Sequence, residues 1–296
     1  MSIADVINIL MSGIFHAAIL FLVAAGLQVV FGVQKIFNLA CGSFYALGAY
    51  MGITFVSIFL KAGLPQPLFI IALIAAGLFM AFVGPIVERG MLKFIYGRDV
   101  HFQLLLTFAI VLIIEDIIRM SWGSSPQSTK GLYLLYGQVN LLGAIIPVYN
   151  LVVIFASLVI AALIGFMLLR TKFGKIIRAA AESSEMSEAL GINMKSVNLK
   201  VFTLGTVLGT LGGALVIPAI SAMPDMGVEL IVLAFAVVVI GGLGSIKGAF
   251  VGALVVGIIK SLAISFYPEL EIFVIYLIVI GVLVCKPEGL FGRSTV

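Results

Sequence analysis

The chain has 296 residues, of which 62% are hydrophobic and 10% are charged, and its formal net charge is +4. An average soluble domain is about half apolar and roughly a quarter charged, so this composition excludes an ordinary soluble fold and indicates a bilayer as the solvent. The basic residues are spread over several loops and form no single stripe, so no nucleic-acid partner is expected.

The apolar segments predict an all-α membrane protein. Long unbroken runs, such as residues 151–169 and 272–284, are typical of helices and not of the short alternating strands of a barrel. A spanning helix needs roughly 20 apolar residues. We expect a polytopic bundle of about eight or nine spans that forms a single domain over residues 1–296. The predicted spans are 9–30, 42–60, 68–87, 102–122, 145–169, 197–220, 229–243, 249–266 and 271–285.

The first of these segments, residues 9–30, is interpreted as a retained span. It has no basic n-region, and Asp5 precedes it, so it does not resemble a cleaved signal peptide. Cys41 and Cys285 lie at or near span ends and share no short-spacing motif, so neither a disulfide framework nor a metal site is indicated.

The distribution of Lys and Arg predicts the orientation of the spans. Loops rich in these residues stay in the cytoplasm, whereas loops that contain only acidic residues give no such signal. An orientation with the N-terminus outside and the C-terminus in the cytoplasm places every basic loop in the cytoplasm and every acidic loop outside. The basic loops and tail contain Arg89, Lys93, Arg98, Arg170, Lys172, Lys175, Arg178, Lys195, Lys200, Lys286 and Arg293, and the acidic loops contain Asp225, Glu229, Glu269 and Glu271.

Several predicted spans contain polar residues that bilayer burial makes costly. Each of them is interpreted first as an interhelical hydrogen-bonding residue and only second as a substrate contact. They are His16, Gln28, Asn38, Gln103 and Thr107.

A charged cluster lies near the outer end of the fourth predicted span. Glu115 and Arg119 are four residues apart on a helix and are expected to pair, with Asp116 beside them, and Trp122 suits a membrane interface. A structural interfacial cluster is the default interpretation, and docking of a binding protein is the alternative.

Glycines are grouped along three predicted spans. Their spacing places small residues on or near one helix face, where backbones can approach closely, so dense helix packing is favoured over a direct role in substrate binding. The groups are Gly42, Gly48 and Gly52; Gly205, Gly209, Gly212 and Gly213; and Gly248, Gly252 and Gly257.

A glycine-rich break interrupts residues 229–266. Gly241, Gly242 and Gly244 lie close to Lys247, and the pattern fits two short spans or one broken, re-entrant segment equally well. Broken backbone at membrane depth is tolerated only where it is buried in protein or lines a watery cavity. The break is therefore a candidate for the pathway, and a tight cytoplasmic turn is the alternative.

The long basic loop after the fifth span predicts a short cytoplasmic helix. Residues 178–190 are good helix formers, Arg178 and Glu182 have the spacing of a helical ion pair, and Gly191 is a typical helix stop. Such a helix is available to another protein, and a solvated connector is the alternative.

This loop resembles the coupling loop of ABC importer permeases, here over residues 171–196. The chain as a whole resembles the high-affinity branched-chain amino acid permease family, whose relatives include urea and short-chain amide permeases. The resemblance rests on the coupling loop and on residues 38–50, 241–252 and 287–292.

The resemblance implies the partners and the roles of particular residues. It implies a second permease subunit, expected to be a different chain with a homodimer as the alternative, two ATPase subunits that carry ATP and Mg, and an external substrate-binding protein, all at the inner membrane. The coupling residues would be Arg178, Ala179, Ala180, Ala181, Glu182 and Gly191, and the candidate pathway or gating residues are Asn38, Gly42, Ser43, Gly241, Gly242 and Gly244.

The chain itself is not expected to be an enzyme or to hold a cofactor. It contains no phosphate-binding G-x-x-x-x-G-K-[ST] motif and no nucleophile–base pair. Branched-chain or other aliphatic amino acids are the first expected substrates, and urea, amides or another small solute come next. Cys41, Gly42 and Ser43 depart from the family pattern and leave the substrate open. A self-sufficient secondary transporter or channel is the alternative of another class.

Overall fold

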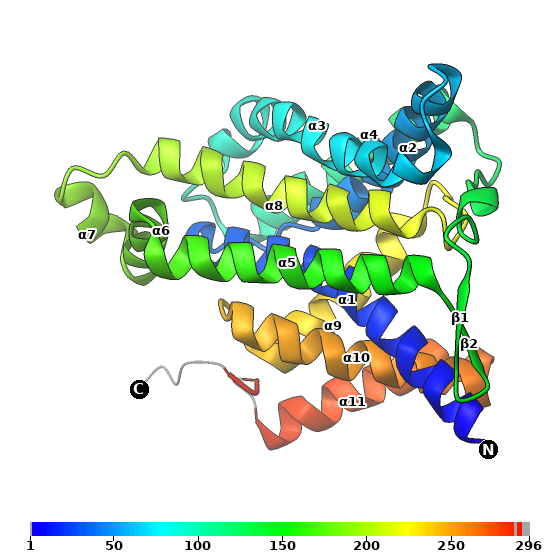
Figure 1. Ribbon diagram of the computed structural model, residues 1–296. Coiled ribbons are helices and arrows are strands. Elements are labelled where there is room, and N and C mark those ends of the chain that lie inside the picture. The colour runs from blue at the N-terminus through cyan, green and yellow to red at the C-terminus, as the bar shows by residue number, and fades with distance from the viewer. Residues whose placement is uncertain (1, 287–288, 292–296) are drawn as a thin grey trace.

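The computed structural model describes residues 2–286 and 289–291, and it is a bundle of helices with one small hairpin (Figure 1). Of the stretch 287–292, which carries part of the family resemblance, only residues 289–291 are described. The long helices are α1 (Ile3–Gln34), α2 (Ala40–Lys61), α3 (Phe69–Gly90), α4 (Val100–Trp122), α5 (Val148–Arg170), α8 (Met194–Val216), α9 (Met226–Gly241), α10 (Ile246–Phe266) and α11 (Glu271–Cys285).

These nine long helices of the described residues confirm the all-α membrane prediction. Six spans, built on α1, α2, α3, α5, α8 and α10, are long and apolar enough to cross a membrane, and α9 and α11 are shorter apolar helices. The remaining elements are two short helices, α6 (Lys172–Glu182) and α7 (Ser184–Ala189), an antiparallel hairpin of β1 (Gln138–Leu141) and β2 (Ala144–Pro147), and single 3-10 turns.

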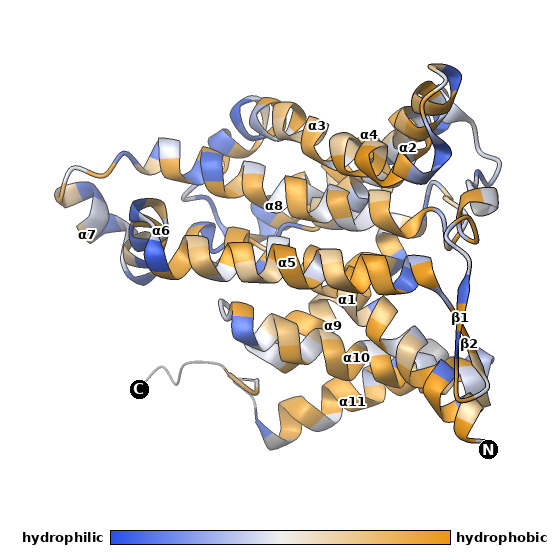
Figure 2. Ribbon diagram, in the orientation of Figure 1, coloured by the Kyte–Doolittle hydropathy of each residue, from blue (hydrophilic) through white to orange (hydrophobic). Residues whose placement is uncertain are grey.

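The bundle has two distinct ends. Figure 1 shows α6 and α7 beyond one end and the β1–β2 hairpin with the start of α1 at the other, and α11 runs back toward the α6–α7 end. In Figure 2 the long helices are mainly hydrophobic along their length, and hydrophilic residues gather at α6, α7 and the loops. Phe82, Phe155 and Phe273 are each more than 60% exposed on different helices. Such an apolar outer surface is what a bilayer covers.

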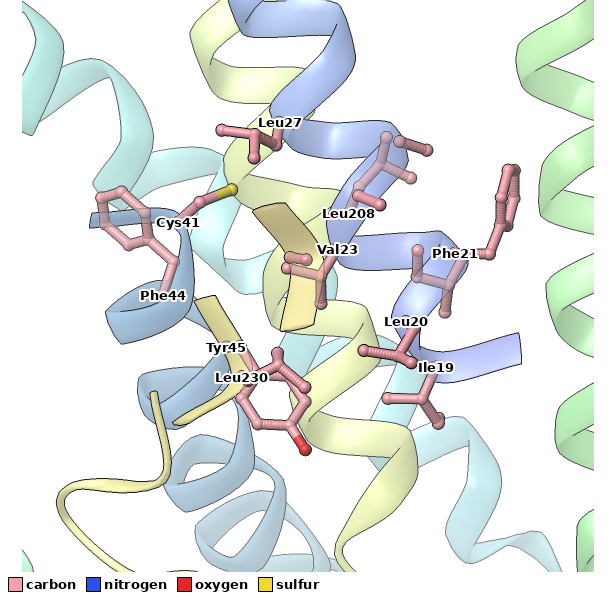
Figure 3. Close-up of a cluster of buried hydrophobic side chains, with 14 of the residues drawn as sticks. Ile19, Leu20, Phe21, Val23, Leu27, Cys41, Phe44, Tyr45, Leu208 and Leu230 are labelled. Atoms are coloured by element: carbon pink, nitrogen blue, oxygen red, sulfur yellow. The ribbon is translucent and has the colours of Figure 1, made fainter. Parts of the chain in front are cut away.

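Helix α1 forms the centre of the core. It contacts α5, α8, α9 and α10, and Leu22, Val23, Ala24 and Ala25 are completely buried. Figure 3 shows Val23 and Leu27 of α1 among Phe44 and Leu208 from neighbouring helices. A helix that is apolar on all sides is either buried in a protein core or in contact with lipid, and α1 is buried among other helices.

Glycines bring the helix backbones together, as their spacing predicted. A Cβ atom at Gly26 would lie 2.6 Å from the carbonyl oxygen of Gly205, which joins α1 to α8. Similarly, a Cβ atom at Gly48 would lie 2.3 Å from the carbonyl oxygen of Thr210, which joins α2 to α8. These glycines therefore act in helix packing, where any side chain would separate the backbones.

The glycine-rich break of residues 229–266 is a tight turn between two separate helices. Helix α9 ends at Gly241, α10 begins at Ile246, and Leu243 and Gly244 between them are exposed. The segment is therefore two separate helices, of which α10 is long and apolar enough to span a membrane and α9 is a shorter apolar helix. Two backbone bonds attach a distant segment to the end of α9: Leu290 N–H donates to the carbonyl of Ile240 at 2.8 Å, and Phe291 N–H donates to that of Gly241 at 3.0 Å.

An irregular segment that the sequence analysis did not single out lies between α1 and α2, at residues 35–39. Cys41, one residue into α2, packs against Gly209, which is past the middle of α8, so α2 begins inside the bundle and not at its surface. The segment's polar backbone groups have partners: Thr107 Oγ1 donates to the carbonyl of Phe37 at 3.4 Å, and Asn38 Oδ1 accepts from Ala40 N–H at 3.1 Å. Broken backbone at this depth requires such bonds.

Candidate functional sites: a charged cavity and an exposed helix pair

A cavity of about 290 Å³ lies among α1, α2, α9, α10 and the end of α8. This volume is close to the lower limit, roughly 300 Å³, of cavities that hold small molecules. The cavity therefore has room for one small solute. Its polar side chains are His16, Tyr45, Glu229 and Lys260, and its apolar side chains include Ile19, Leu20, Leu230, Leu233 and Ile264.

A loose ion pair lies in the cavity wall. Lys260 Nζ of α10 is 3.7 Å from Glu229 Oε1 of α9, and the two side chains are 14% and 61% exposed. Ionisable residues in membrane helices are costly and usually face a partner or a water-filled cavity. Here both conditions hold, so this pair is the strongest candidate for a functional group in the bundle.

The other polar groups come from α1 and α2. His16 Nδ1 is 2.8 Å from the carbonyl oxygen of Ser12, an acceptor, so Nδ1 carries a proton. Tyr45 is 3% exposed. Figure 3 shows Ile19 and Leu20 on α1, Tyr45 on α2 and Leu230 in one group of buried side chains. Polar and aliphatic groups from five helices thus meet at the cavity.

A close contact between Gly42 and Gly227 places α9 against α2 beside this cavity. Each glycine lies in the first turn of its helix, and a Cβ atom at Gly42 would be 2.1 Å from the carbonyl oxygen of Gly227. As a result, Tyr45 lies close to the first two turns of α9, which contain Glu229 and Leu230. Gly42 helps to form the cavity by packing and does not line it.

The remaining candidate pathway residues have structural contacts. Asn38 caps the start of α2, and Ser43 is 5% exposed next to Gly42. Gly241, Gly242 and Gly244 form the α9–α10 turn, and Gln28 holds it: Gln28 Nε2 donates to the carbonyl of Gly242 at 2.9 Å, and its Oε1 accepts from Gly244 N–H. A gating role for these six residues stays a prediction.

Two of the polar residues predicted to bond between helices do so over long sequence distances. Gln28 bonds to the α9–α10 turn, and Thr107 of α4 bonds to the irregular segment. His16, Asn38 and Gln103 instead bond to backbone groups of their own segments. Polar side chains in this bundle therefore bond chiefly to backbone groups, many of them at irregular positions.

The cluster at the end of α4 has the expected ion pair and an additional bond. Arg119 pairs with Glu115 across one helical turn, and Trp122 Nε1 donates to Thr54 Oγ1 of α2 at 2.8 Å. The indole also lies 5.6 Å from the ring of Tyr50. This cluster fastens α4 to α2, which agrees with the structural interpretation.

The predicted coupling segment forms two short helices and not one. Ser183 interrupts the helix, because its backbone is extended and its side chain accepts from Met186 N–H as the N-cap of α7. Gly191 has a φ of +84° directly after α7, so the predicted glycine stop is confirmed. Between residues that the structure describes, the salt bridges are Glu115–Arg119 and Glu229–Lys260, and the expected pair of Arg178 and Glu182 is not among them.

The coupling residues do not all face the same way. Arg178, Ala179, Glu182 and Gly191 are exposed, Ala181 is half-buried, and Ala180 is only 2% exposed. Helix α6 contacts α1 and α8. Its buried face thus rests on the bundle while its opposite face is open.

Two exposed apolar residues of this helix pair escaped the sequence analysis. Met186 is 62% exposed and Leu190 is 76% exposed, both beyond the bundle at the end of α7. The neighbouring residues are mainly polar, so these two side chains form a small exposed apolar patch on the α6–α7 helix pair. Such patches often mark protein-binding surfaces. The signal was present as apolar residues within an otherwise polar loop.

Three cavity residues were also missed or misplaced. Lys260 was overlooked, although a lysine inside a 21-residue apolar helix is itself a sign of function. Glu229 was assigned to an outer loop, whereas it lies in the first turns of α9. Tyr45 was treated only as part of a family motif, and its position on the cavity depends on the contact between Gly42 and Gly227.

Comparison with known proteins gives a consistent result. The family model described as "Branched-chain amino acid transport system / permease component" matches residues 9–283. The chain is 24% identical to the high-affinity branched-chain amino acid transport system permease protein BraD of Pseudomonas aeruginosa, over 97% of this chain and 96% of that protein. It is 26% identical to LivH of Escherichia coli, which has the same description, over 93% and 92%. The ribose import permease protein RbsC of Haemophilus influenzae is 27% identical over 88% and 77%.

Proposed function

The chain belongs to the family of branched-chain amino acid transport system permease components, and we propose that it is a transmembrane permease subunit of an ABC importer. In this proposal it moves branched-chain or other aliphatic amino acids across the inner membrane. The bond chemistry takes place elsewhere, because ATP is bound and hydrolysed on two separate ATPase subunits. A second permease subunit and an external substrate-binding protein complete the assembly.

The observation that carries the proposal is the exposed helix pair at one end of the bundle. Met186 and Leu190 project beyond the bundle on α7 and offer apolar side chains to a partner protein, while α6 contacts both α1 and α8. A partner that moves α6 therefore acts directly on the central helix. Helix α1 also contributes His16 and Leu20 to the cavity. We therefore propose that α1 transmits movements of the ATPase subunits to the cavity.

The proposed orientation puts α6 and α7 in the cytoplasm. The segment around them is rich in Lys and Arg, which favours the cytoplasmic side. The β1–β2 hairpin and the start of α1 lie at the opposite end and would then be outside, where the substrate-binding protein docks. The C-terminal helix α11 would end in the cytoplasm.

The comparisons favour this assembly over a self-sufficient transporter. The matching family is described as one component of a transport system. BraD and LivH, which are described as branched-chain amino acid permease proteins, match this chain over nearly their whole length. The sugar permease RbsC is also related, so the solute itself has to be measured.

The deciding experiment is affinity purification of the tagged chain in mild detergent. We expect ATPase subunits and a second permease subunit to remain bound, and we expect ATP-dependent accumulation of leucine when the assembly and its binding protein are reconstituted in liposomes. Recovery of the chain alone, with solute uptake in the absence of any ATPase, would refute the proposal. Uptake of ribose or urea and not leucine would keep the assembly and change the substrate.

A further inference from the structure

The cavity wall carries two opposite charges a short distance apart, on a surface that is otherwise mainly apolar. Lys260 Nζ and Glu229 Oε1 are 3.7 Å apart, which is longer than the roughly 2.7–2.9 Å of a direct charge-assisted hydrogen bond. The two opposite charges lie close enough together for one ligand with an anionic and a cationic group to contact both.

Close glycine contacts bring α9 and α10 together at one end of the two helices. A Cβ atom at Gly252 would lie 2.4 Å from the carbonyl oxygen of Val237, and one at Gly248 would lie 2.0 Å from that of Gly241. These backbone contacts join the last turns of α9 to the first turns of α10, whereas Glu229 and Lys260 lie toward the opposite ends of the two helices. Lys260 is only 14% exposed in an apolar helix, and an ionisable residue in such a position usually marks a functional site.

From this geometry we infer that Glu229 and Lys260 bind the charged groups of a zwitterionic amino acid in the cavity, an inference that rests on the proposed transport function. The α-ammonium group would bond to the Glu229 carboxylate and the α-carboxylate group to the Lys260 ammonium. Ile19, Leu20 and Leu233 would then contact the aliphatic side chain. The cavity thereby acts as a second selective site, separate from the binding protein.

The dimensions and chemistry of the cavity match this ligand class. A volume of about 290 Å³ admits one small solute. The two charges match those of the ligand, and the aliphatic part of the wall suits an apolar side chain, whereas a charged side chain placed against it would be costly. A sugar carries no charge to exchange with the ion pair, so the site favours amino acids over sugars.

The test uses the complete importer in liposomes, with its binding protein at saturating concentration and leucine as the solute. In the double variant Glu229→Lys with Lys260→Glu the two charges remain paired but change places. If the pair binds substrate, the ligand must reverse its ends and lose its fit to the apolar wall. We expect the assembly to purify normally and leucine uptake to fall roughly ten- to hundredfold, the size of one lost charged hydrogen bond.

A neutral double variant, Glu229→Gln with Lys260→Gln, covers the case in which the exchanged charges prevent assembly. It removes both charges of the pair, and we expect it to assemble and to lose uptake to a similar degree. The matched control is Glu115→Gln with Arg119→Gln, which removes an ion pair of α4 that does not line the cavity, and it should transport at the normal rate.

The inference fails if either assembled Glu229–Lys260 variant takes up leucine at the wild-type rate, because the pair would then be structural only. The proposed function fails separately, and earlier, if the wild-type chain binds no ATPase or the wild-type importer accumulates no leucine. A normal wild-type importer together with impaired cavity variants supports both.

Discussion

Gln28 of α1 donates a hydrogen bond to the carbonyl of Gly242, 214 residues further along the chain, over 2.9 Å. The same side chain accepts from Gly244 N–H, so one side-chain amide bonds to both a carbonyl and an N–H group of the α9–α10 turn. Gln28 is 1% exposed. The central helix is thus connected to the α9–α10 turn by two hydrogen bonds of one polar side chain.

Replacing Gln28 with Leu should destabilise the chain. The carbonyl of Gly242 would keep the 3.3 Å bond from Ser245 N–H but lose Gln28, and Gly244 N–H would lose its bond to Gln28. Each lost hydrogen bond costs about 0.5–1.5 kcal/mol. Thermal unfolding of the purified protein in detergent would measure the loss. Gln103→Leu is a matched control, since Gln103 is similarly buried but bonds only to the nearby carbonyl of Arg98. Equal losses in both variants would contradict the proposed importance of the Gln28 contact.

Gly42→Ala and Gly227→Ala should each force α2 and α9 apart. The added Cβ atom would lie 2.1 Å or 2.5 Å from a backbone carbonyl oxygen, and overpacking of this kind costs about 1–3 kcal/mol. We expect lower thermal stability and reduced leucine uptake, because the first turns of α9 form part of the cavity.

The control for these variants is Gly165→Ala in α5. An added Cβ atom at Gly165 meets no atom within 4 Å, and alanine in a helix interior is favoured over glycine by roughly 0.5–1 kcal/mol. This variant should be neutral or slightly more stable. A loss of stability at Gly165 as large as that at Gly42 would show that close backbone contact is not the cause.

Leu190→Asp should weaken the binding of the ATPase subunits. It places a charge where an apolar contact with a partner is proposed, and removal of such an anchor typically costs more than 1 kcal/mol, which is about tenfold in affinity. Co-purification and ATP-driven uptake would measure the effect. Glu182→Arg should act in the same direction by reversing an exposed charge on the same projection.

Leu142→Asp provides the matched control at the other end of the molecule. Leu142 is 78% exposed, almost the same as Leu190 at 76%, and lies in the β1–β2 turn. ATPase binding should be unchanged in this variant. If Leu142→Asp released the ATPases and Leu190→Asp did not, the proposed orientation of the bundle would be reversed.

Cysteine labelling tests that orientation directly. In a chain without Cys41 and Cys285, Ser184→Cys should react with an impermeant thiol reagent only from the cytoplasmic side, whereas Asn140→Cys should react from outside. Both positions are exposed in the structure. Labelling of Ser184→Cys in intact cells would exclude a cytoplasmic role for α6 and α7.

The helices themselves could be predicted from the sequence because their signal is local. Long apolar runs, Gly191 after a polar helix and the i, i+4 spacing of Glu115 and Arg119 each depend on neighbours within a few residues. The structure confirms the long helices, the glycine stop and the ion pair. Glycine spacing likewise predicted the packing of Gly48 and Gly205, because close helix approach requires small residues on one face.

The cavity could not be predicted in the same way because it depends on contacts between distant segments. Tyr45, Glu229 and Lys260 come from three helices: the contact of Gly42 with Gly227 joins α2 to α9, and the contact of Gly252 with Val237 joins α10 to α9. The irregular segment at residues 35–39 was also unforeseen, since its apolar residues Ile36 and Phe37 continue the apolar pattern of a helix. Partners such as Thr107, not local propensity, allow the chain to leave the helix there.

The bonds of Leu290 and Phe291 to the end of α9 have a consequence for synthesis of the protein. The two amides that bond to the end of α9 lie some fifty residues after it and are therefore synthesised later. The carbonyls of Ile240 and Gly241 lack these partners until translation has passed α11. The end of α9 therefore reaches its final hydrogen bonding only after residues 290 and 291 have been synthesised. A fusion placed immediately after α11 would compete with this closing step, whereas a long flexible spacer before the fusion would leave it undisturbed.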